Sequence, residues 1–149
     1  QDLGLENTFV QDATSVSAKK GTFRGLHFQK PPHAQTTLIR VASGRIFDVT
    51  VDIRAGSPTF GRHVSLTLNA DDWRMLYLPK GLAHGFCTLV DDCHVAYKLD
   101  DHYAPDKAAG IQIDDVELEI DWPLNPRQGI ISEKDRANPC LRDLGPVFD

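Results

Sequence analysis

Apolar and polar residues alternate one by one in the middle of this chain. In the segment FDVTVDI, residues 47–53, every second side chain is apolar. Side chains of a β-strand point alternately to opposite faces of the sheet, so a period of two predicts a strand with one buried face. The alternation therefore favours a fold built on β-sheets.

Other short β-rich runs flank this strand, with turn residues between them. We expect three hairpins, which turn at residues 42–44, 69–72 and 91–92. Strands at this spacing are typical of a sandwich or a barrel. One short helix is indicated in the segment ISEKDRANPCL, where Ser132 is a typical N-cap and Pro139 a typical terminator.

Composition narrows the class of protein. A net charge of −5 over 149 residues argues against nucleic acid as the partner, and this length indicates a single domain over residues 1–149. No apolar run approaches the roughly 20 residues of a membrane-spanning helix. The three cysteines show no C-x-x-C spacing, so we expect reduced thiols and a cytoplasmic protein.

One stretch runs against the acidic character of the chain. Residues 13–47 contain no Asp or Glu, but they carry Lys19, Lys20, Arg24, Lys30, Arg40 and Arg45. A local positive field of this kind suits a small anionic ligand. On charge alone, an ordinary solvated cluster of charges is the more common explanation.

The segment PKGLAHGF has the spacing P-x-G-x-x-H at Pro79, Gly81 and His84. This spacing resembles a motif of the cupin superfamily, and the resemblance implies an all-β fold: a double-stranded β-helix, or jelly roll, with a short C-terminal helical segment. Without this resemblance, the more common explanation of His84 is a histidine that lies in the core and is hydrogen-bonded there.

A metal site is not expected in this barrel. Many cupins bind a metal with an H-x-H pair and a downstream Glu, whereas this chain has His27-x-Gln29 and no Glu between residues 6 and 117. A site of two histidines and one carboxylate would need an Asp from elsewhere. Because Leu26 and Phe28 flank His27, a strand directs His27 away from them, into the barrel or into solvent.

Six segments together resemble one family, the dTDP-4-dehydrorhamnose 3,5-epimerases. They occur in the family's order and span nearly the whole chain: GTFRGLHFQ, FDVTVDIRAGSPTFG, LYLPKGLAHGF, AYKLDDHYAPD, DWP and ISEKDRANP. The resemblance implies a metal-free cupin homodimer without a cofactor. Its substrate would be a deoxythymidine-diphosphate 4-keto-6-deoxy sugar.

The resemblance also implies catalytic roles for three residues. The C4 ketone acidifies the hydrogens on C3 and C5, so inversion needs a base on one face of the ring and an acid on the other. His27 matches the family's base, Asp135 the carboxylate that orients it, and Tyr97 the acid. Without the resemblance, simpler explanations of these residues are more common. His27 would be a hydrogen-bonded histidine, Asp135 a charge in the helix and Tyr97 a half-buried aromatic residue of a strand.

Further positions match residues that bind the substrate. Arg24 matches an arginine that contacts the diphosphate, and Tyr103 an aromatic that stacks on thymine. Gln11 and Lys134 match contacts to the nucleotide sugar, and His84 matches a donor near the sugar.

Three positions depart from the family pattern. Thr37 replaces a Lys that helps to hold the enolate charge at the C4 oxygen, Ala13 replaces an Asn, and Ala108 lies near the place of a Glu. The chain also begins with Gln1, and we expect that N-terminal strands of the family precede Gln1 in the whole protein. These departures leave the exact sugar and the replacement for the Lys open.

Four functions remain in competition. A 3,5-epimerase is favoured, and an epimerase that inverts C3 alone in an unusual deoxysugar pathway comes next. A 3,4-ketoisomerase would also use a cupin and a base, but it would move the carbonyl group. A non-catalytic cupin that binds sugar nucleotides is supported by Thr37 and by the missing N-terminal contacts.

Overall fold

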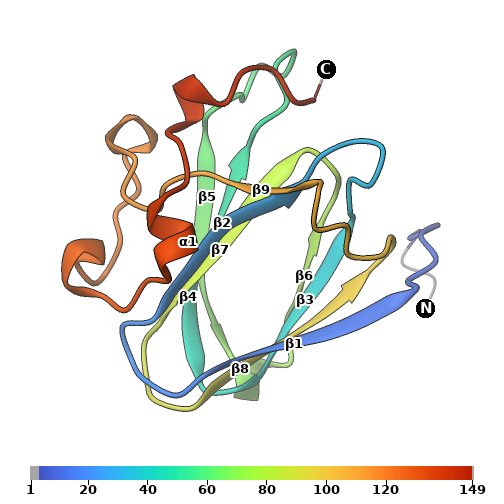
Figure 1. Ribbon diagram of the computed structural model, residues 1–149. Helices are drawn as coiled ribbons and strands as arrows, with labels where there is room; N and C mark the ends of the chain where they lie inside the picture. The colour runs from blue at the N-terminus through green and yellow to red at the C-terminus, as the bar shows by residue number, and fades with distance from the viewer. Residues whose placement is uncertain (1–3, 149) are drawn as a thin grey trace.

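The computed structural model describes residues 4–148 and contains nine β-strands (Figure 1). The strands are β1 (Gln11–Ser17), β2 (Phe23–Gln29), β3 (Thr37–Ser43), β4 (Arg45–Asp52), β5 (His63–Asn69), β6 (Met75–Leu78), β7 (Leu82–Thr88), β8 (Cys93–Leu99) and β9 (Ala108–Gly110). They form one sheet in the order β1-β8-β3-β6 and a second in the order β5-β4-β7-β2-β9. All of these pairings are antiparallel. The expected all-β jelly roll is confirmed.

The three predicted hairpins are wrong, although their strands and turns are present. β3 and β4, β5 and β6, and β7 and β8 follow one another in the chain, yet the two members of each pair belong to different sheets. Each turn therefore carries the chain from one sheet to the other. A turn signal fixes a change of direction, but pairing depends on which strands close the barrel.

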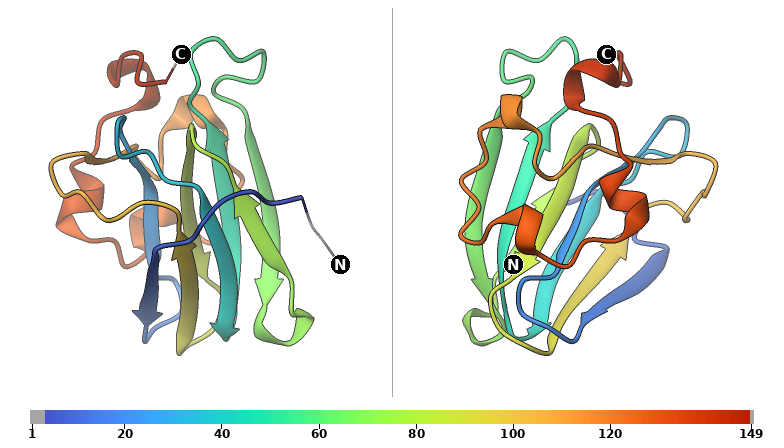
Figure 2. Two further views of the ribbon diagram at one scale, coloured as in Figure 1. Left: turned by 90° about the vertical axis from the view of Figure 1, so that its right-hand side faces the viewer. Right: turned by 60° about the vertical axis from the view of Figure 1, so that its left-hand side comes forward.

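Strand β4 is buried on both faces, contrary to the prediction of one buried face. Val49 and Val51 on its outer face pack with Leu118 and Leu141 of the C-terminal segment. Figure 2 shows this segment, orange to red, lying over the outside of the second sheet. Because the C-terminal segment covers the apolar side of β4, the polar side of the strand, with the fully buried Asp48, faces the space between the sheets.

The space between the sheets has its own apolar core. Ile39, Val41, Leu78, Phe86 and Val95 are buried there with their neighbours from both sheets. This core fills one part of the barrel and leaves the part beside β2, β7 and β8 open to a cavity. The site described below occupies that part.

The C-terminal segment contains short helices: α1 (Glu133–Arg136) and the single 3₁₀ turns η2 (Val116–Leu118), η3 (Pro126–Gln128) and η4 (Leu141–Asp143), with η1 (Ala70–Asp72) between β5 and β6. Ser132 caps α1 as predicted, since its Oγ accepts a hydrogen bond from the backbone N–H of Asp135. The helix lies against β2 (Figure 1). Among residues 4–148, no helix has the length and apolar character needed to cross a membrane.

Candidate active site

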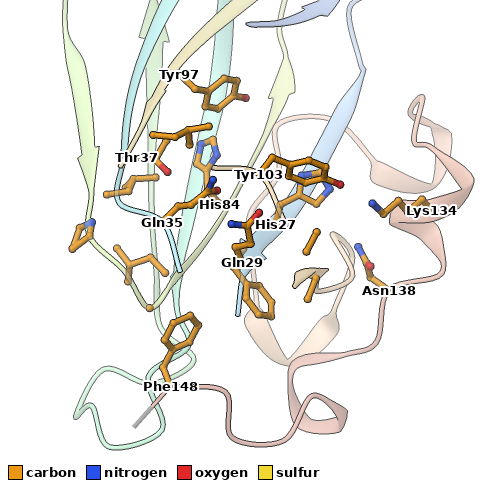
Figure 3. Close-up of a pocket in the computed structure, with 18 residues that line it drawn as sticks. His27, Gln29, Gln35, Thr37, His84, Tyr97, Tyr103, Lys134, Asn138 and Phe148 are labelled. Atoms are coloured by element: carbon orange, nitrogen blue, oxygen red, sulfur yellow. The ribbon is translucent and has the colours of Figure 1, made fainter. Parts of the chain in front are cut away.

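A cavity of about 370 Å³ opens between the two sheets (Figure 3). Six of the nine predicted site residues line it: His27, Thr37, His84, Tyr97, Tyr103 and Lys134. Asp135 lies directly behind His27, whereas Arg24 and Gln11 lie outside the lining of this cavity. The sequence motifs therefore converge on one place, although they are spread over more than 100 residues of chain.

An irregularity in β2 sets the direction of His27. The pairing of β2 with β7 shifts register between Arg24 and His27, as in a β-bulge. The two backbones approach closely here: a Cβ on Gly25, where φ is +120°, would lie 2.6 Å from the Cα of Gly85. Glycine is thus required at this point, and the bulge lets both Arg24 and His27 reach the same side of the sheet.

His27 forms a hydrogen-bonded pair with Asp135. The His27 Nε2 lies 2.6 Å from Asp135 Oδ1, and the other carboxylate oxygen accepts a hydrogen bond from the Gly25 N–H at 3.3 Å. The imidazole side chain is 52% exposed, while that of Asp135 is 6% exposed. A buried carboxylate therefore holds an imidazole whose opposite edge is open to the cavity.

The electrostatics of this pair follow from its contacts. Burial by itself raises the pKa of the Asp135 carboxyl, but the hydrogen bond and charge of His27 and the N–H of Gly25 outweigh it and hold that pKa below its ordinary value. Asp135 thus remains ionised and fixes which nitrogen of His27 carries the proton. The free nitrogen, Nδ1, is then the basic atom that faces the cavity.

Tyr97 lies across the cavity from His27 (Figure 3). Burial raises the pKa of its phenol, the negative charge of Asp48 raises it further, and the nearby Arg24 partly offsets both effects. The hydroxyl therefore keeps its proton at neutral pH. A proton donor and a proton acceptor accordingly lie on opposite walls of one cavity.

A second histidine–carboxylate pair lies deeper in the barrel. His84 Nε2 is 2.7 Å from Oδ2 of Asp48, a residue with no exposed surface. The His84 side chain is 14% exposed and lines the cavity. Sequence reasoning missed Asp48, because it belongs to the polar half of an alternating strand that was expected to face solvent.

The loop that carries Tyr103 is held by two glutamine side chains. The Tyr103 N–H donates to Gln11 Oε1 at 2.7 Å, so Gln11 acts on the site through Tyr103. The Gln29 carboxamide accepts from the Ala104 N–H at 2.9 Å and donates to the His102 carbonyl at 3.1 Å. Gln29 was not predicted, and its position two residues after His27 on the same strand is the signal that could have identified it.

Arg24 lines a smaller depression of about 270 Å³ next to the main cavity. This depression shares His27, His84 and Tyr97 with the cavity and reaches β1 on its other side. The Arg24 guanidinium donates to Ser17 Oγ at 3.0 Å and to the Val16 carbonyl at 2.8 Å. These bonds hold a cation beside the three residues that the two spaces share.

The charge of the cavity matches an anionic ligand. No Asp or Glu of residues 4–148 lines it, and Lys134 forms no ion pair with any residue of that range. In the same part of the chain, no three His, Cys, Asp or Glu side chains are grouped as they would be to hold a metal ion. The cavity walls therefore carry a base, an acid and hydrogen-bond donors around one space.

Comparison with known proteins identifies the family. The family model described as dTDP-4-dehydrorhamnose 3,5-epimerase matches residues 1–143. The chain belongs to this family. It is 44% identical over 147 residues to a dTDP-4-dehydrorhamnose 3,5-epimerase of Sinorhizobium fredii, a match covering 99% of this chain and 73% of that protein. A relative from Methanothermobacter thermautotrophicus with the same name is 46% identical over 149 residues, covering 99% and 79%.

Solved structures of this epimerase family share the fold. The Bacillus anthracis epimerase with TDP and pyrophosphate bound has a TM-score of 0.89 at 51% identity, covering 93% of this chain and 78% of that one. The Legionella pneumophila epimerase in complex with dTDP-4-keto-L-rhamnose has a TM-score of 0.90 at 41% identity, covering 99% and 79%. The chain is thus an isomerase of the dTDP-4-dehydrorhamnose 3,5-epimerase type, and the resemblance found in the sequence is confirmed.

Proposed function

We propose that the protein inverts C3 and C5 of a dTDP-4-keto-6-deoxyhexose, with His27 as base and Tyr97 as acid. His27 removes the proton from the carbon next to the C4 ketone, and the electron pair of that C–H bond forms an enolate. Tyr97 then donates its hydroxyl proton to the same carbon from the other face. His27 releases its proton to water and Tyr97 recovers one, so the step is balanced without a redox partner.

One observation carries this proposal: a base and an acid face one another across a cavity without carboxylates in its lining. Asp135 serves as a positioning residue, because it contacts the base and is hidden from the cavity behind it. The role of Tyr97 is supported by the cause of its raised pKa, since burial keeps the phenol in its protonated form.

The C4 oxygen gains negative charge in the enolate and needs hydrogen-bond donors. Thr37 lies in the cavity wall on the same side as Tyr97 (Figure 3), and it stands where the family has a Lys. We assign the Thr37 hydroxyl to the C4 oxygen, with His84 as a second contact to the sugar. A neutral hydroxyl stabilises an enolate less than an ammonium group does.

The remaining predicted residues are assigned to binding of the diphosphate and of the thymine ring. Arg24 and Lys134 supply positive charge on either side of His27. Tyr103 is 55% exposed at the cavity and offers a flat surface for thymine. Gln11 supports this surface through the Tyr103 backbone.

A narrower reaction, inversion at C3 alone, is the second candidate. Thr37 suits it, because a weaker donor at the C4 oxygen slows proton removal at both C3 and C5, and the more difficult of the two removals is then the first to be lost. A Streptomyces bikiniensis protein described as a 3'-monoepimerase, in complex with dTDP-quinovose, is 33% identical to this chain with a TM-score of 0.84. That match covers 90% of this chain and 67% of the other.

We also propose that the protein acts in the cytoplasm as a homodimer. The three cysteines are free, which suits a reducing compartment. Strand β1 is an edge strand with Val16 55% exposed, and an open edge with an apolar side chain is suited to pairing with a second copy. Light scattering of the protein in solution tests the dimer.

Solvent deuterium incorporation into the 4-keto sugar tests the reaction. Label at both C3 and C5 supports the 3,5-epimerase, and label at C3 alone supports the narrower enzyme. His27→Ala is expected to abolish exchange while dTDP binding persists. Unchanged exchange in that variant would remove His27 from the role of base, and label at neither carbon in the wild type would contradict an epimerase.

A further inference from the structure

A cluster of polar side chains lies beside the start of β3, outside the lining of the cavity. Asn7, from the segment before β1, donates through Nδ2 to Asp100 Oδ2 at 2.9 Å, and its Oδ1 accepts from the Tyr77 hydroxyl at 2.7 Å. Tyr77 belongs to β6 and Asp100 follows β8, the two strands that pair with β3 on either side. The left view of Figure 2 shows the segment before β1, in dark blue, crossing the first sheet. One amide therefore ties together both neighbours of β3.

Asp100 also holds the backbone directly before β3. Its Oδ1 accepts from the Thr36 N–H at 2.6 Å, and its own N–H donates to the Thr36 carbonyl at 3.1 Å. The Asp100 side chain is 7% exposed, and Lys80 Nζ lies 3.7 Å from its Oδ2. Buried hydrogen bonds of this kind fix a backbone closely, because breaking them leaves polar groups without partners. Both polar backbone groups of Thr36 are thus held by one residue, immediately before Thr37.

Thr37 depends on the position of its backbone more than a lysine would. Its hydroxyl is one rotatable bond away from the main chain, whereas a lysine carries its ammonium group on a flexible four-carbon stem. A lysine can therefore reach the C4 oxygen from a range of backbone positions, but threonine cannot. Misplacement of an active-site group by about 1 Å can cost about 100-fold in rate. The exact position of β3 accordingly decides whether the Thr37 hydroxyl meets the C4 oxygen.

We infer that Asn7 and Asp100 are positioning residues of the active site, which fix the start of β3 so that the Thr37 hydroxyl reaches the C4 oxygen. The inference rests on the proposed function, because it needs an enolate at C4. Neither Asn7 nor Asp100 lines the cavity, so both act through Thr37 and not through contact with the sugar. Their removal should slow the chemical step and leave substrate binding almost unchanged.

Rates of solvent deuterium exchange into the 4-keto sugar nucleotide test this inference. Asn7→Ala should lower kcat by about three- to tenfold with KM nearly unchanged. Asp100→Asn should lower kcat as well, because one amide oxygen can accept from Thr36 or from Asn7 but not from both in their present positions. Tyr77→Phe removes only the hydrogen bond to Asn7 Oδ1, so it should lower kcat by a smaller factor.

A double-mutant cycle separates positioning from a general loss of structure. Thr37→Val has no hydroxyl left to position, so adding Asn7→Ala to it should slow exchange no further. If Asn7→Ala slowed Thr37→Val by the same factor as the wild type, Asn7 would act elsewhere and the inference would be wrong. It would also be wrong if Asn7→Ala left kcat unchanged, or raised KM alone.

Asn125→Ala is the matched control for the loss of an asparagine side chain. Asn125 Oδ1 accepts from the Arg127 N–H at 3.0 Å and lies outside the cavity lining, so this variant should exchange as the wild type does. Thermal melting establishes that each variant is folded at the assay temperature. If Asn7→Ala is not, Tyr77→Phe, which removes a single hydroxyl group, takes its place in the cycle.

Failure of the inference and failure of the proposed function give different results. Normal exchange in the wild type, with effects of Asn7→Ala and Thr37→Val that simply multiply, would refute the positioning role alone. A wild type that shows no exchange at C3 or C5 would refute the epimerase and the positioning role together.

Discussion

The rings of His84 and Tyr97 lie edge to face, with their centroids 6.3 Å apart. Asp48 lies beneath this pair, bonded to His84 at 2.7 Å and wholly buried. The same carboxylate therefore orients the imidazole and adds to the raised pKa of the Tyr97 phenol. A single residue of β4 thus influences two groups that line the cavity.

Asp48→Asn is expected to lower the pH at which Tyr97 ionises. Burial remains in this variant, but the negative charge that disfavours tyrosinate is gone. Tyrosinate absorbance during an alkaline titration measures the shift, and subtraction of the Tyr97→Phe titration isolates Tyr97 from the other tyrosines. Identical titrations of wild type and Asp48→Asn would show that the charge of Asp48 does not affect the pKa of the Tyr97 phenol.

Asp135→Asn should slow deuterium exchange by about 10- to 100-fold with little change in KM, because a neutral amide orients His27 less well and stabilises its protonated form less. In the wild type, Asp135 should lose its charge only well into the acid range, because the pKa of this carboxyl is held below its ordinary value. Deuterium exchange should therefore not decline for this reason until the pH is that low. A large rise in KM at constant kcat would instead assign Asp135 to substrate binding.

The composition of the site was more predictable from sequence than the path of the chain. His27, Asp135 and Tyr97 were predicted because the segments that carry them resemble the family, and the structure places His27 and Tyr97 in one cavity with Asp135 bonded to His27. The hairpins failed because a turn signal is local, whereas the partner of a strand depends on contacts far along the chain.

Residues that act through packing were missed for the same reason. Asp48 looked like a solvent-facing residue, because nothing in its own strand reveals that the C-terminal segment covers the opposite face. Gln29 follows His27 by two residues, but its use depends on the loop of residues 102–104, which comes close to it only in the folded protein. Both positions are defined by tertiary contacts that local periodicity does not encode.

Asp52→Asn should lower the free energy of unfolding by about 1–3 kcal/mol at neutral pH. Asp52 is buried and accepts hydrogen bonds from Arg54, Ser57 and Thr59, and the Arg54 bond is the main cause of its strongly lowered pKa. A lowered native pKa adds stability above the unfolded pKa of about 3.9, and this stability is lost as the pH falls below that value. Urea unfolding at several pH values should therefore show the difference between wild type and variant shrinking in acid. If the difference in unfolding free energy stayed constant with pH, the stabilisation by Asp52 would not come from its charge.

Gly25→Ala should destabilise the protein by about 3 kcal/mol or more, since its backbone conformation disfavours a side chain and the added Cβ meets Gly85. Gly145→Ala is the matched control: φ is also positive, at +70°, but no heavy atom lies within 4 Å of the new Cβ. This control should cost only about 1–2 kcal/mol. Equal losses in urea unfolding would show that backbone strain, and not the close approach of β2 to β7, dominates at Gly25.

Thr37→Val should reduce kcat for exchange by about 10- to 100-fold and leave KM nearly unchanged. Valine keeps the shape of threonine but cannot donate to the C4 oxygen, whose charge appears only as the enolate forms, so the loss falls on the transition state. Thr67→Val, at an exposed threonine of β5 outside the cavity, controls for the effect of the same substitution on a strand. If Thr37→Val exchanges as fast as Thr67→Val, the donor to the C4 oxygen must be another group, and His84 in the cavity wall is the next candidate.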